Sequence, residues 1–404
     1  MNVRLADRLR ALLGPAAVHA DVRGTAPLVE PATEEACAVL LGTATEIGWK
    51  VVVEGAGHWQ STVDRGADVR LSTRRLAGPP DVNASDLVAT AATGLPWDRL
   101  RQALADRGAW VALDPPGAGT RTLGSVLATG TAGPLRGGFG GVRDHVLGLT
   151  LVTGDGRIIR PGGRVVKNVA GFDITKLALG SFGAFGVITR AHLRLRAVPR
   201  ADVTLAASAS RDTVIAAGRQ LLAAGHSPAA MELHAPQLAD AREWRLALRL
   251  LGTDAEVEAQ HEAVLADAGV PFAPAPPGLW HEAALAVAAP AVTIRIGALP
   301  SALEDALDLL AHHLDETIES PITVSVLAGA IRWAGDADAD MLRRFRHAAA
   351  GREMPVTIER APWHLLRQVG HFGAYREGTG RLIERLREVY DPLDTLVVPL
   401  EVSA

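Results

Sequence analysis

The stretch that is most informative about the fold is residues 180–189, which read Gly180-Ser181-Phe182-Gly183-Ala184-Phe185-Gly186-Val187-Ile188-Thr189. Its three glycines recur at every third position and lead into an apolar segment, residues 187–195, whose partial alternation predicts a long β-strand. Glycine allows the backbone to approach a ligand closely or to adopt a positive φ. The spacing therefore indicates a place where a flat ring system can lie against the main chain.

The surrounding sequence is unusually rich in glycine. Residues 115–190 hold 18 of the 41 glycines in 76 positions, which leaves 23 for the other 328 residues. Outside residues 115–190 the glycine content is close to the usual background of roughly 7%, and within them it is more than three times higher. This segment includes Lys167-Asn168-Val169-Ala170-Gly171-Phe172-Asp173, in a chain that has only three lysines and three asparagines. The composition favours a functional segment.

A long polar loop is predicted between Asp114 and Ser125, and it leads into small residues at 128–133 and then into the glycine-rich stretch 137–144. The flanking segments are apolar, and a long loop inside a compact domain usually carries function. A flexible surface loop is the alternative interpretation.

A further glycine motif, Gly55-Ala56-Gly57, directly follows a strand predicted at 49–53. The backbone N–H groups of such a loop can cradle a phosphate. The motif is not a dinucleotide-binding fingerprint, because Gln60 stands in place of the third glycine, and no Walker lysine follows. An ordinary turn is the alternative interpretation.

Local signals outline the remaining organisation. Residues 28–57 predict a β-α-β unit whose helix is capped by Thr33 and ended by Gly48. A Gly154-Asp155-Gly156 turn predicts a hairpin between strands at 146–153 and 157–160. After Pro199, helices at 211–224, 254–268, 301–314 and 337–350 alternate with short strands in an order that nearly repeats across a Pro-rich link. This order predicts two ferredoxin-like halves that form one antiparallel sheet.

Composition excludes several classes of protein. The chain has 404 residues, of which 48% are hydrophobic and 21% charged, so two or three globular domains are expected. No run of 18 apolar residues predicts a membrane-spanning helix, and the N-terminal residues lack the apolar core of a secretory signal. A net charge of −4 without a basic block argues against a nucleic-acid partner. The single cysteine, Cys37, forms no internal disulfide and cannot hold an iron–sulfur cluster alone, which favours an intracellular protein.

The order of the four motifs is more informative than any one of them. Gly-x-Gly after a strand, Pro-x-Gly with Leu-Gly-Ser, Lys-Asn-x-Ala-Gly-Phe-Asp and Gly-Ser-x-Gly-x-x-Gly-Val-Ile-Thr follow one another along the chain. This order resembles the flavin domain of the vanillyl-alcohol-oxidase/PCMH superfamily, and within it the FAD-binding subunits of glycolate oxidase. The likeness is strongest over 28–200 and returns at Tyr390-Asp391-Pro392. Where the family ends in Asn-Pro-Gly, this chain has Val397-Val398-Pro399-Leu400.

The resemblance implies an α+β fold. A PCMH-type FAD-binding domain of two α+β subdomains is expected at 28–199, after an N-terminal helical segment at 1–27. A ferredoxin-like antiparallel-sheet cap is expected at 200–375, and a C-terminal helix and tail at 376–404 are expected to return to the FAD domain.

The resemblance also implies the residues that bind FAD. The pyrophosphate loop would be Glu54, Gly55, Ala56, Gly57, His58 and Trp59. The segment along the flavin and ribityl chain would include Pro115, Thr122, Leu123, Gly124, Ser125 and Thr129. The start of the strand that faces the cofactor would supply Gly180, Gly183, Gly186, Val187 and Ile188. His58 could be linked covalently to the flavin, as in the berberine-bridge-like branch, or could only donate a hydrogen bond to the pyrophosphate.

The catalytic base is not identified by sequence. Active 2-hydroxy-acid dehydrogenases of the superfamily carry a His-x-Gly-Asp-Gly-Asn motif in the second domain, and this chain has none. His364 and His371 flank a loop that could approach the flavin. Arg295, Arg332 and Arg360 lie on predicted strands, where one could bind a substrate carboxylate, although a solvated sheet face is the favoured interpretation. No metal site is expected.

Three functions are compatible with the sequence. The first is the FAD-binding subunit of a glycolate oxidase-like 2-hydroxy-acid dehydrogenase, active in a complex with a second flavoprotein subunit and an iron–sulfur subunit. The second is a stand-alone flavin oxidoreductase for a sugar acid or lactone, and the third is an assembly subunit without catalysis of its own. The expected location is the cytoplasm, with membrane association only through partners.

Overall fold

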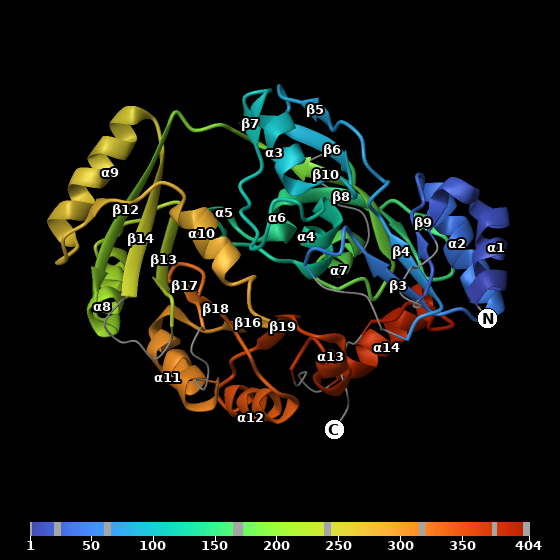
Figure 1. Ribbon diagram of the computed structural model, residues 1–404. Coiled ribbons are helices and arrows are strands. Elements are labelled where there is room, and N and C mark those ends of the chain that lie inside the picture. Colours follow the sequence, from blue (N-terminus) through green and yellow to red (C-terminus); the bar gives the residue numbers. More distant parts are fainter. Residues whose placement is uncertain are drawn as a thin grey trace.

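The structure is a computed structural model, and it describes residues 2–19, 26–59, 66–164, 173–237, 244–314, 320–373 and 378–398. Figure 1 shows two parts side by side. The first, residues 2–197, is the part expected from the sequence to bind FAD and is called the FAD-domain part; the second, residues 201–369, is called the cap. The C-terminal helix lies against the first part. The Lys167–Phe172 portion of the predicted motif lies outside the described residues, whereas Asp173 caps a short helix.

The first subdomain is a mixed four-stranded sheet in the order β1-β2-β4-β3. The Thr33 side chain accepts a hydrogen bond from the Ala36 N–H at 3.1 Å, and Gly48 adopts φ 81° at the other end of the helix, so both predicted helix signals are confirmed. The helix buries Cys37, Leu40 and Leu41 against this sheet. Its elements are α1 (Asn2–Leu13), η1 (Pro15–Ala17), β1 (Val18–His19), β2 (Leu28–Val29), α2 (Glu34–Ile47), β3 (Val51–Glu54) and β4 (Val69–Ser72).

The second subdomain is a five-stranded antiparallel sheet in the order β5-β6-β10-β8-β9. Strands β8 and β9 pair on either side of Gly154-Asp155-Gly156, which confirms the predicted hairpin. Its elements are β5 (Asp81–Asn83), β6 (Val88–Ala92), α3 (Trp97–Ala105), α4 (Leu123–Thr129), α5 (Arg136–Phe139), α6 (Val142–His145), β8 (Val146–Val152), β9 (Ile158–Ile159), α7 (Ile174–Ala178) and β10 (Val187–Arg194), with β7 (Ala109–Trp110) paired to β11 (Arg196–Ala197).

The predicted polar loop needs a correction. Residues 123–129 form a helix, α4, because the Thr122 side chain accepts a hydrogen bond from the Ser125 N–H at 3.2 Å and caps it. Leu123, Val126 and Leu127 are buried, and this apolar face stabilises the helix against the second sheet.

The cap is one eight-stranded antiparallel sheet in the order β15-β12-β14-β13-β17-β18-β16-β19. Each half has the β-α-β-β-α-β connectivity of a ferredoxin-like unit, and β13 pairs with β17 to join the halves, as predicted. The strands are β12 (Ala201–Ala209), β13 (Ala230–Ala235), β14 (Trp244–Gly252), β15 (Ala273–Pro274), β16 (Val292–Gly297), β17 (Ile322–Ser325), β18 (Ala330–Gly335) and β19 (Val356–Arg360). The helices are α8 (Arg211–Ala223), α9 (Asp254–Asp267), α10 (Leu279–Ala286), α11 (Leu303–Leu314, after η2, Pro300–Ala302), α12 (Ala339–Ala350) and α13 (Trp363–Val369).

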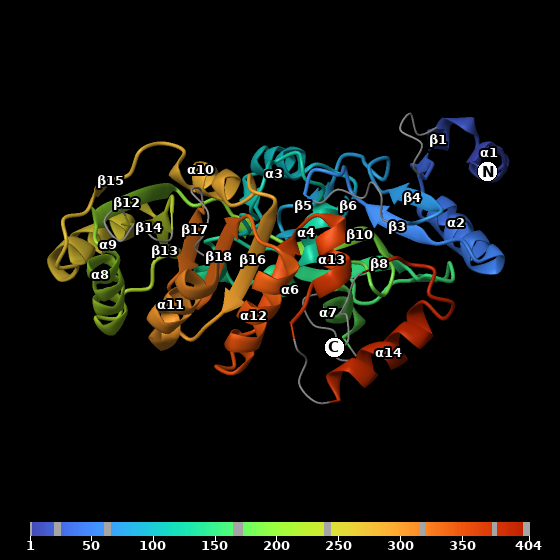
Figure 2. The same ribbon diagram turned by 60° about the horizontal axis from the view of Figure 1, so that its bottom comes forward.

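The two faces of the cap sheet differ in chemistry. Helices α8, α9, α11 and α12 cover one face (Figure 2). Side chains such as Trp333 and Phe345 fill the core between these helices and the sheet. The opposite face approaches the FAD-domain part, since α5 contacts β13. That inner face holds polar and charged side chains that are buried between the two parts.

The chain returns to the first subdomain at its C-terminal end. After α14 (Thr379–Tyr390), the Val51 N–H donates to Thr395 O at 2.8 Å and the Val397 N–H donates to Val51 O at 2.9 Å. Leu396 therefore pairs in parallel with Val51 at the edge of the first sheet, at the start of β3.

Candidate FAD site

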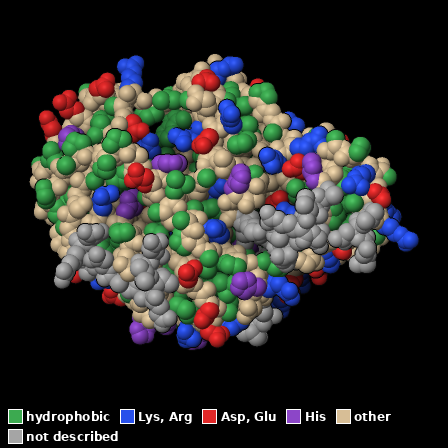
Figure 3. All heavy atoms as spheres, viewed as in Figure 1, with side chains coloured by type: hydrophobic (Ala, Val, Ile, Leu, Met, Phe, Trp, Pro, Cys, Tyr) green, Lys and Arg blue, Asp and Glu red, His purple; other side chains and the backbone are tan. Residues whose placement is uncertain are grey.

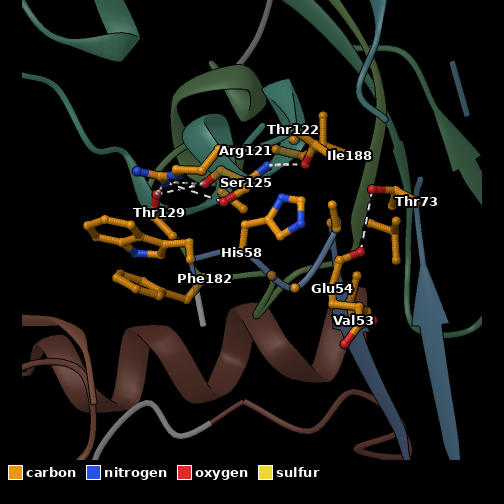
Figure 4. A pocket seen from close by; sticks show the side chains of 18 of the residues that line it. Val53, Glu54, His58, Thr73, Arg121, Thr122, Ser125, Thr129, Phe182 and Ile188 are labelled. Carbon is orange, nitrogen blue, oxygen red and sulfur yellow. Dashed lines mark hydrogen bonds between the residues drawn. The ribbon is translucent and has the colours of Figure 1, made fainter. Parts of the chain in front are cut away.

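A cleft opens where the end of β3, the start of α4, the start of β10 and the cap segment around His371 meet (Figure 4). Fourteen of the predicted cofactor residues line it: Glu54, Gly55, Ala56, Gly57, His58, Trp59, Thr122, Gly124, Ser125, Thr129, Gly183, Gly186, Val187 and Ile188. Seven further residues line it that the sequence did not single out as cofactor-binding: Val53, Thr73, Arg121, Ala128, Phe182, His371 and Val398. Residues from widely separated parts of the sequence thus converge on one cleft.

Three predicted cofactor residues do not line this cleft. Leu123 is buried in the core of the second subdomain. Gly180 packs backbone to backbone with Gly130, where an added Cβ would lie 3.0 Å from the Gly180 Cα. Pro115 instead lines a cavity of about 860 Å³ between α3 and α10, on the hollowed face seen in Figure 3.

Backbone conformation and close contacts explain why glycine is required at several positions of the cleft. A Cβ on Gly55 would lie 2.2 Å from Thr122 Oγ1, so only glycine lets the β3 loop touch the cap of α4. Gly57 adopts φ +73° and Gly183 φ +85°, and a Cβ on Gly57 would meet nothing within 4 Å. A Cβ on Gly186 would lie 2.4 Å from Val152 O. The backbone can therefore approach a bound molecule closely, which is what a pyrophosphate and a flat ring require.

Arg121 is a buried cation that lies over the Trp59 ring, with 4.0 Å between its Cζ and the ring centroid. Only 2% of it is exposed, and its Nη2 donates to Thr131 Oγ1 at 3.0 Å and to Thr129 Oγ1 at 3.2 Å. Its Nε has no hydrogen-bond acceptor among the described residues. Burial lowers the pKa of Arg121 to about 9, while Glu359 opposes the shift. An anionic or carbonyl-bearing ligand in the cleft would complete its bonding, so the residues present fit FAD.

The cap supplies one wall of the cleft. The His371 ring stacks on Phe182 with 4.0 Å between the ring centroids, and its Nδ1 lies 2.8 Å from Ile358 O. A carbonyl only accepts, so Nδ1 carries the proton and Nε2 is the basic nitrogen of the neutral ring. The Trp59 Nε1–H donates to Glu359 O at 3.1 Å and connects the β3 loop to the cap. Of the two histidines considered, His371 lines the cleft and His364 does not.

His58 stands within the cleft, between Glu54 and the side chains of α4 (Figure 4). Its Nδ1 lies 3.1 Å from Thr120 O. Whether it bonds covalently to the flavin stays a prediction.

The interpretation of Arg332 as a residue on a solvated sheet face is wrong. Arg332 is 7% exposed, and its Nε lies 2.7 Å from Glu359 Oε2 at the interface between the cap and the FAD-domain part. Arg295 shares the same carboxylate, with 3.0 Å between its Nε and Glu359 Oε1. Arg360 is turned elsewhere and donates to Ala288 O and Pro290 O. Among the residues that the structure describes, no group of three or more His, Cys, Asp or Glu side chains could hold a metal ion.

Comparisons with known proteins agree with this geometry. Residues 25–162 match the family model of the FAD binding domain. Glycolate oxidase subunit GlcE of Escherichia coli (strain K12) is 40% identical over 136 residues, which are 33% of this chain and 39% of that protein. D-lactate dehydrogenase of Archaeoglobus fulgidus is 34% identical over 171 residues, 42% of this chain and 38% of that protein. These matches span about two fifths of the length of the two curated relatives.

Solved structures show the same fold over nearly the whole chain. p-Cresol methylhydroxylase superposes with a TM-score of 0.77 at 12% identity, over 98% of this chain and 96% of that one. Alkyldihydroxyacetonephosphate synthase superposes with a TM-score of 0.72 at 16% identity, over 99% of this chain and 85% of that one. The solved structures therefore show that this chain shares their fold, and the family model identifies an FAD binding domain at residues 25–162.

Proposed function

We propose that this chain is the FAD-binding subunit of a glycolate oxidase-like 2-hydroxy-acid dehydrogenase. The observation that carries the proposal is the position of the cofactor cleft, which adjoins a buried, arginine-rich face of the cap. Arg295 and Arg332 on that face, and Arg121 in the cleft, form an excess of positive charge suited to an acid substrate. The likeness to GlcE and to a D-lactate dehydrogenase supports a 2-hydroxy acid.

In the proposed reaction, a 2-hydroxy acid loses a hydride from Cα and a proton from its hydroxyl group and becomes a 2-oxo acid. Bound FAD would supply the hydride acceptor. The glycine loops of the FAD domain would hold the cofactor, and the arginines would orient the acid. His371 Nε2 is the group of the cap wall suited to accept the hydroxyl proton.

Electrons would leave through partner subunits, a second flavoprotein and an iron–sulfur protein. Cys37, the only cysteine of the sequence, is buried and cannot itself bind a cluster. We place the complex in the cytoplasm, with any membrane contact made by the partners. None of the helices within the described parts of the chain is long and apolar enough to cross a bilayer.

The visible spectrum and an anaerobic titration test the proposal. The purified chain should carry close to one FAD, and glycolate or D-lactate should bleach the flavin slowly unless partner subunits from native extract are added. Rapid turnover of glycolate by the single chain would contradict the need for partners. A flavin that no 2-hydroxy acid bleaches, with or without partners, would favour the second candidate.

The second candidate is an FAD-binding assembly subunit without catalysis of its own. It is supported by the sequence, which contains no His-x-Gly-Asp-Gly-Asn motif. Under this proposal a related subunit performs the chemistry, and variants of His371 leave the activity of the reconstituted complex unchanged.

A further inference from the structure

Helix α14 carries an apolar stripe that no described part of the chain covers. The helix lies at the edge of the molecule (Figure 2), and none of its 12 residues is buried, although it is strongly amphipathic. Leu382 is 59% exposed and Val389 is 54% exposed. Together with the half-buried Leu386, these residues recur at intervals of four and three positions, so they form one stripe along the helix.

The helix is fixed to the rest of the chain near its C-terminal end. The Tyr390 ring lies edge-on to Phe185, with 6.0 Å between the ring centroids, and Arg387 Nη2 donates to Asp391 Oδ2 at 3.1 Å. At the N-terminal end, Gly378 supplies no side-chain cap. An isolated helix of this length is only marginally stable in water, because most helical stability in proteins comes from packing of the apolar face. The exposed stripe therefore indicates a surface that another molecule covers.

Three charged side chains border the stripe on one side. Arg381, Arg385 and Glu388 are exposed, and their side chains form no hydrogen bond or ion pair with any described residue. At 3.6 residues per turn, all three fall on the same side of the line through Leu382 and Val389. Two positive charges and one negative charge are thus free to pair with an incoming surface.

A second copy of the same helix, antiparallel to the first, matches both the stripe and the charges. A two-fold axis makes the contacts reciprocal and brings the charged side of one helix to the charged side of the other. When Leu382 packs against Val389 of the second copy, Glu388 of the second copy stands midway between the levels of Arg381 and Arg385. The same contacts form again across the axis. One register therefore joins the apolar side chains and places each negative charge between two positive ones.

We propose that α14 is a dimerisation helix, and that it pairs antiparallel with α14 of a second copy of this chain. The apolar stripe supplies the affinity, and the charges fix the register and the orientation, as charged positions do beside the seam of a coiled coil. A pair of helices about 18 Å long covers less than a standard interface of about 1,600 Å², so the dimer should dissociate on dilution. This pairing is independent of the proposed reaction.

The first test is sedimentation equilibrium of the FAD-loaded chain between about 1 and 100 µM, a range suited to weak association. The parent chain should change reversibly from monomer to dimer. Leu382→Glu/Val389→Glu should raise the dissociation constant of the dimer at least tenfold. Leu299→Glu is the matched control, since it places the same charge on a side chain of the cap that is 72% exposed, and it should leave the dissociation constant unchanged. Thermal unfolding should show that these variants keep the parent fold.

The second test reverses the charges beside the stripe. Glu388→Arg leaves only positive charges there, and Arg381→Glu/Arg385→Glu leaves only negative ones. Each variant alone should dimerise at least tenfold more weakly than the parent chain, because like charges then face each other. An equal mixture of the two should form a heterodimer at least as tight as the parent dimer.

Three outcomes would overturn the inference. The first is a parent chain that stays monomeric over the whole concentration range, and the second is a dimer that Leu382→Glu/Val389→Glu does not weaken. The third is a mixture of the two charge variants that does not associate. Capture of a different protein by α14 of a monomeric chain would count as the first outcome, because the molecule that covers the stripe would not be a second copy.

Discussion

Gly57 shows how one residue can determine cofactor binding. It adopts φ +73° beside open space, so a side chain there points into the cleft. Gly57→Asp should bring a carboxylate towards the FAD pyrophosphate and abolish binding, and Gly57→Asn should retain most of it, because asparagine tolerates a positive φ without charge. The flavin content per chain of the two variants is measured from the absorbance after gel filtration. Equal flavin content in the two variants would contradict the placement of the pyrophosphate.

His371 is the residue on which the proposed chemistry depends. Its Nδ1–H is engaged by Ile358 O, which fixes Nε2 as the basic nitrogen. His371→Asn should slow anaerobic flavin reduction by a 2-hydroxy acid by roughly 10²–10⁴-fold, the usual contribution of a general base. An unchanged rate of flavin reduction in the variant would assign His371 a packing role against Phe182 only.

The short helix α5 fixes how closely the cap approaches the FAD domain. Gly138→Ala would place a Cβ 2.6 Å from the carbonyl oxygen of Ala229, and the two parts would have to separate. We expect a loss of roughly 1–3 kcal/mol in the free energy of unfolding, the usual effect of overpacking, measured by urea denaturation. Gly163→Ala is the control, since a Cβ there meets nothing within 4 Å. Equal losses in both variants would contradict the close contact.

Some elements follow from the sequence, and others depend on contacts that the sequence does not reveal. The caps of α2, the Gly154–Gly156 hairpin and the ferredoxin-like order were predictable because they depend on neighbouring residues. Helix α4 was missed because its sequence is rich in small and polar residues, and its stability comes from tertiary burial. Helices α10 and α13 were missed for lack of a strong amphipathic pattern.

The candidate site shows the same division. Its glycines were predictable because backbone geometry restricts those positions to glycine. Arg121 was not, since an arginine in a polar loop carries no local sign that it will be buried on Trp59. Likewise, Arg332 and Glu359 are 27 residues apart in the chain, and only the sheet register brings them together. Pairing between distant segments is what the sequence alone could not supply.

The buried ion pairs on the inner face of the cap make the stability of the protein depend on pH. Although burial alone would raise the pKa of Glu359, Arg332 and Arg295 hold it below the ordinary value of 4.5. Because the pKa of Glu359 is lower in the folded than in the unfolded protein, its charge stabilises the native state at pH values above the unfolded-state pKa. This stabilisation is lost as the pH falls through the folded-state pKa. Glu359→Gln should lower the free energy of unfolding by about 3–5 kcal/mol at pH 7 and should flatten its decline below pH 4.5. Parallel stability profiles of the two proteins between pH 3 and 7 would contradict this role.

Asp391 holds the C-terminal tail against β3, next to the cofactor cleft. This residue is 3% exposed, and its carboxylate accepts from the N–H groups of Thr395 at 2.8 Å and Leu396 at 3.0 Å. These bonds hold the tail along Val51, so that Val398 reaches the wall of the cleft.

Asp391→Ala should therefore release the tail. Hydrogen bonds to a charged group contribute about 1.5–3 kcal/mol each, so we expect a loss of roughly 3 kcal/mol in the free energy of unfolding, measured by urea denaturation. FAD affinity, measured by flavin fluorescence under native conditions, should fall with it, because the cleft loses one wall. Asp394→Asn is the control: that side chain is 71% exposed and lies at φ 52°, which asparagine tolerates, so it should change either quantity little. If Asp391→Ala loses stability but binds FAD as tightly as the parent chain, the tail stabilises the first sheet without contributing to the cofactor site.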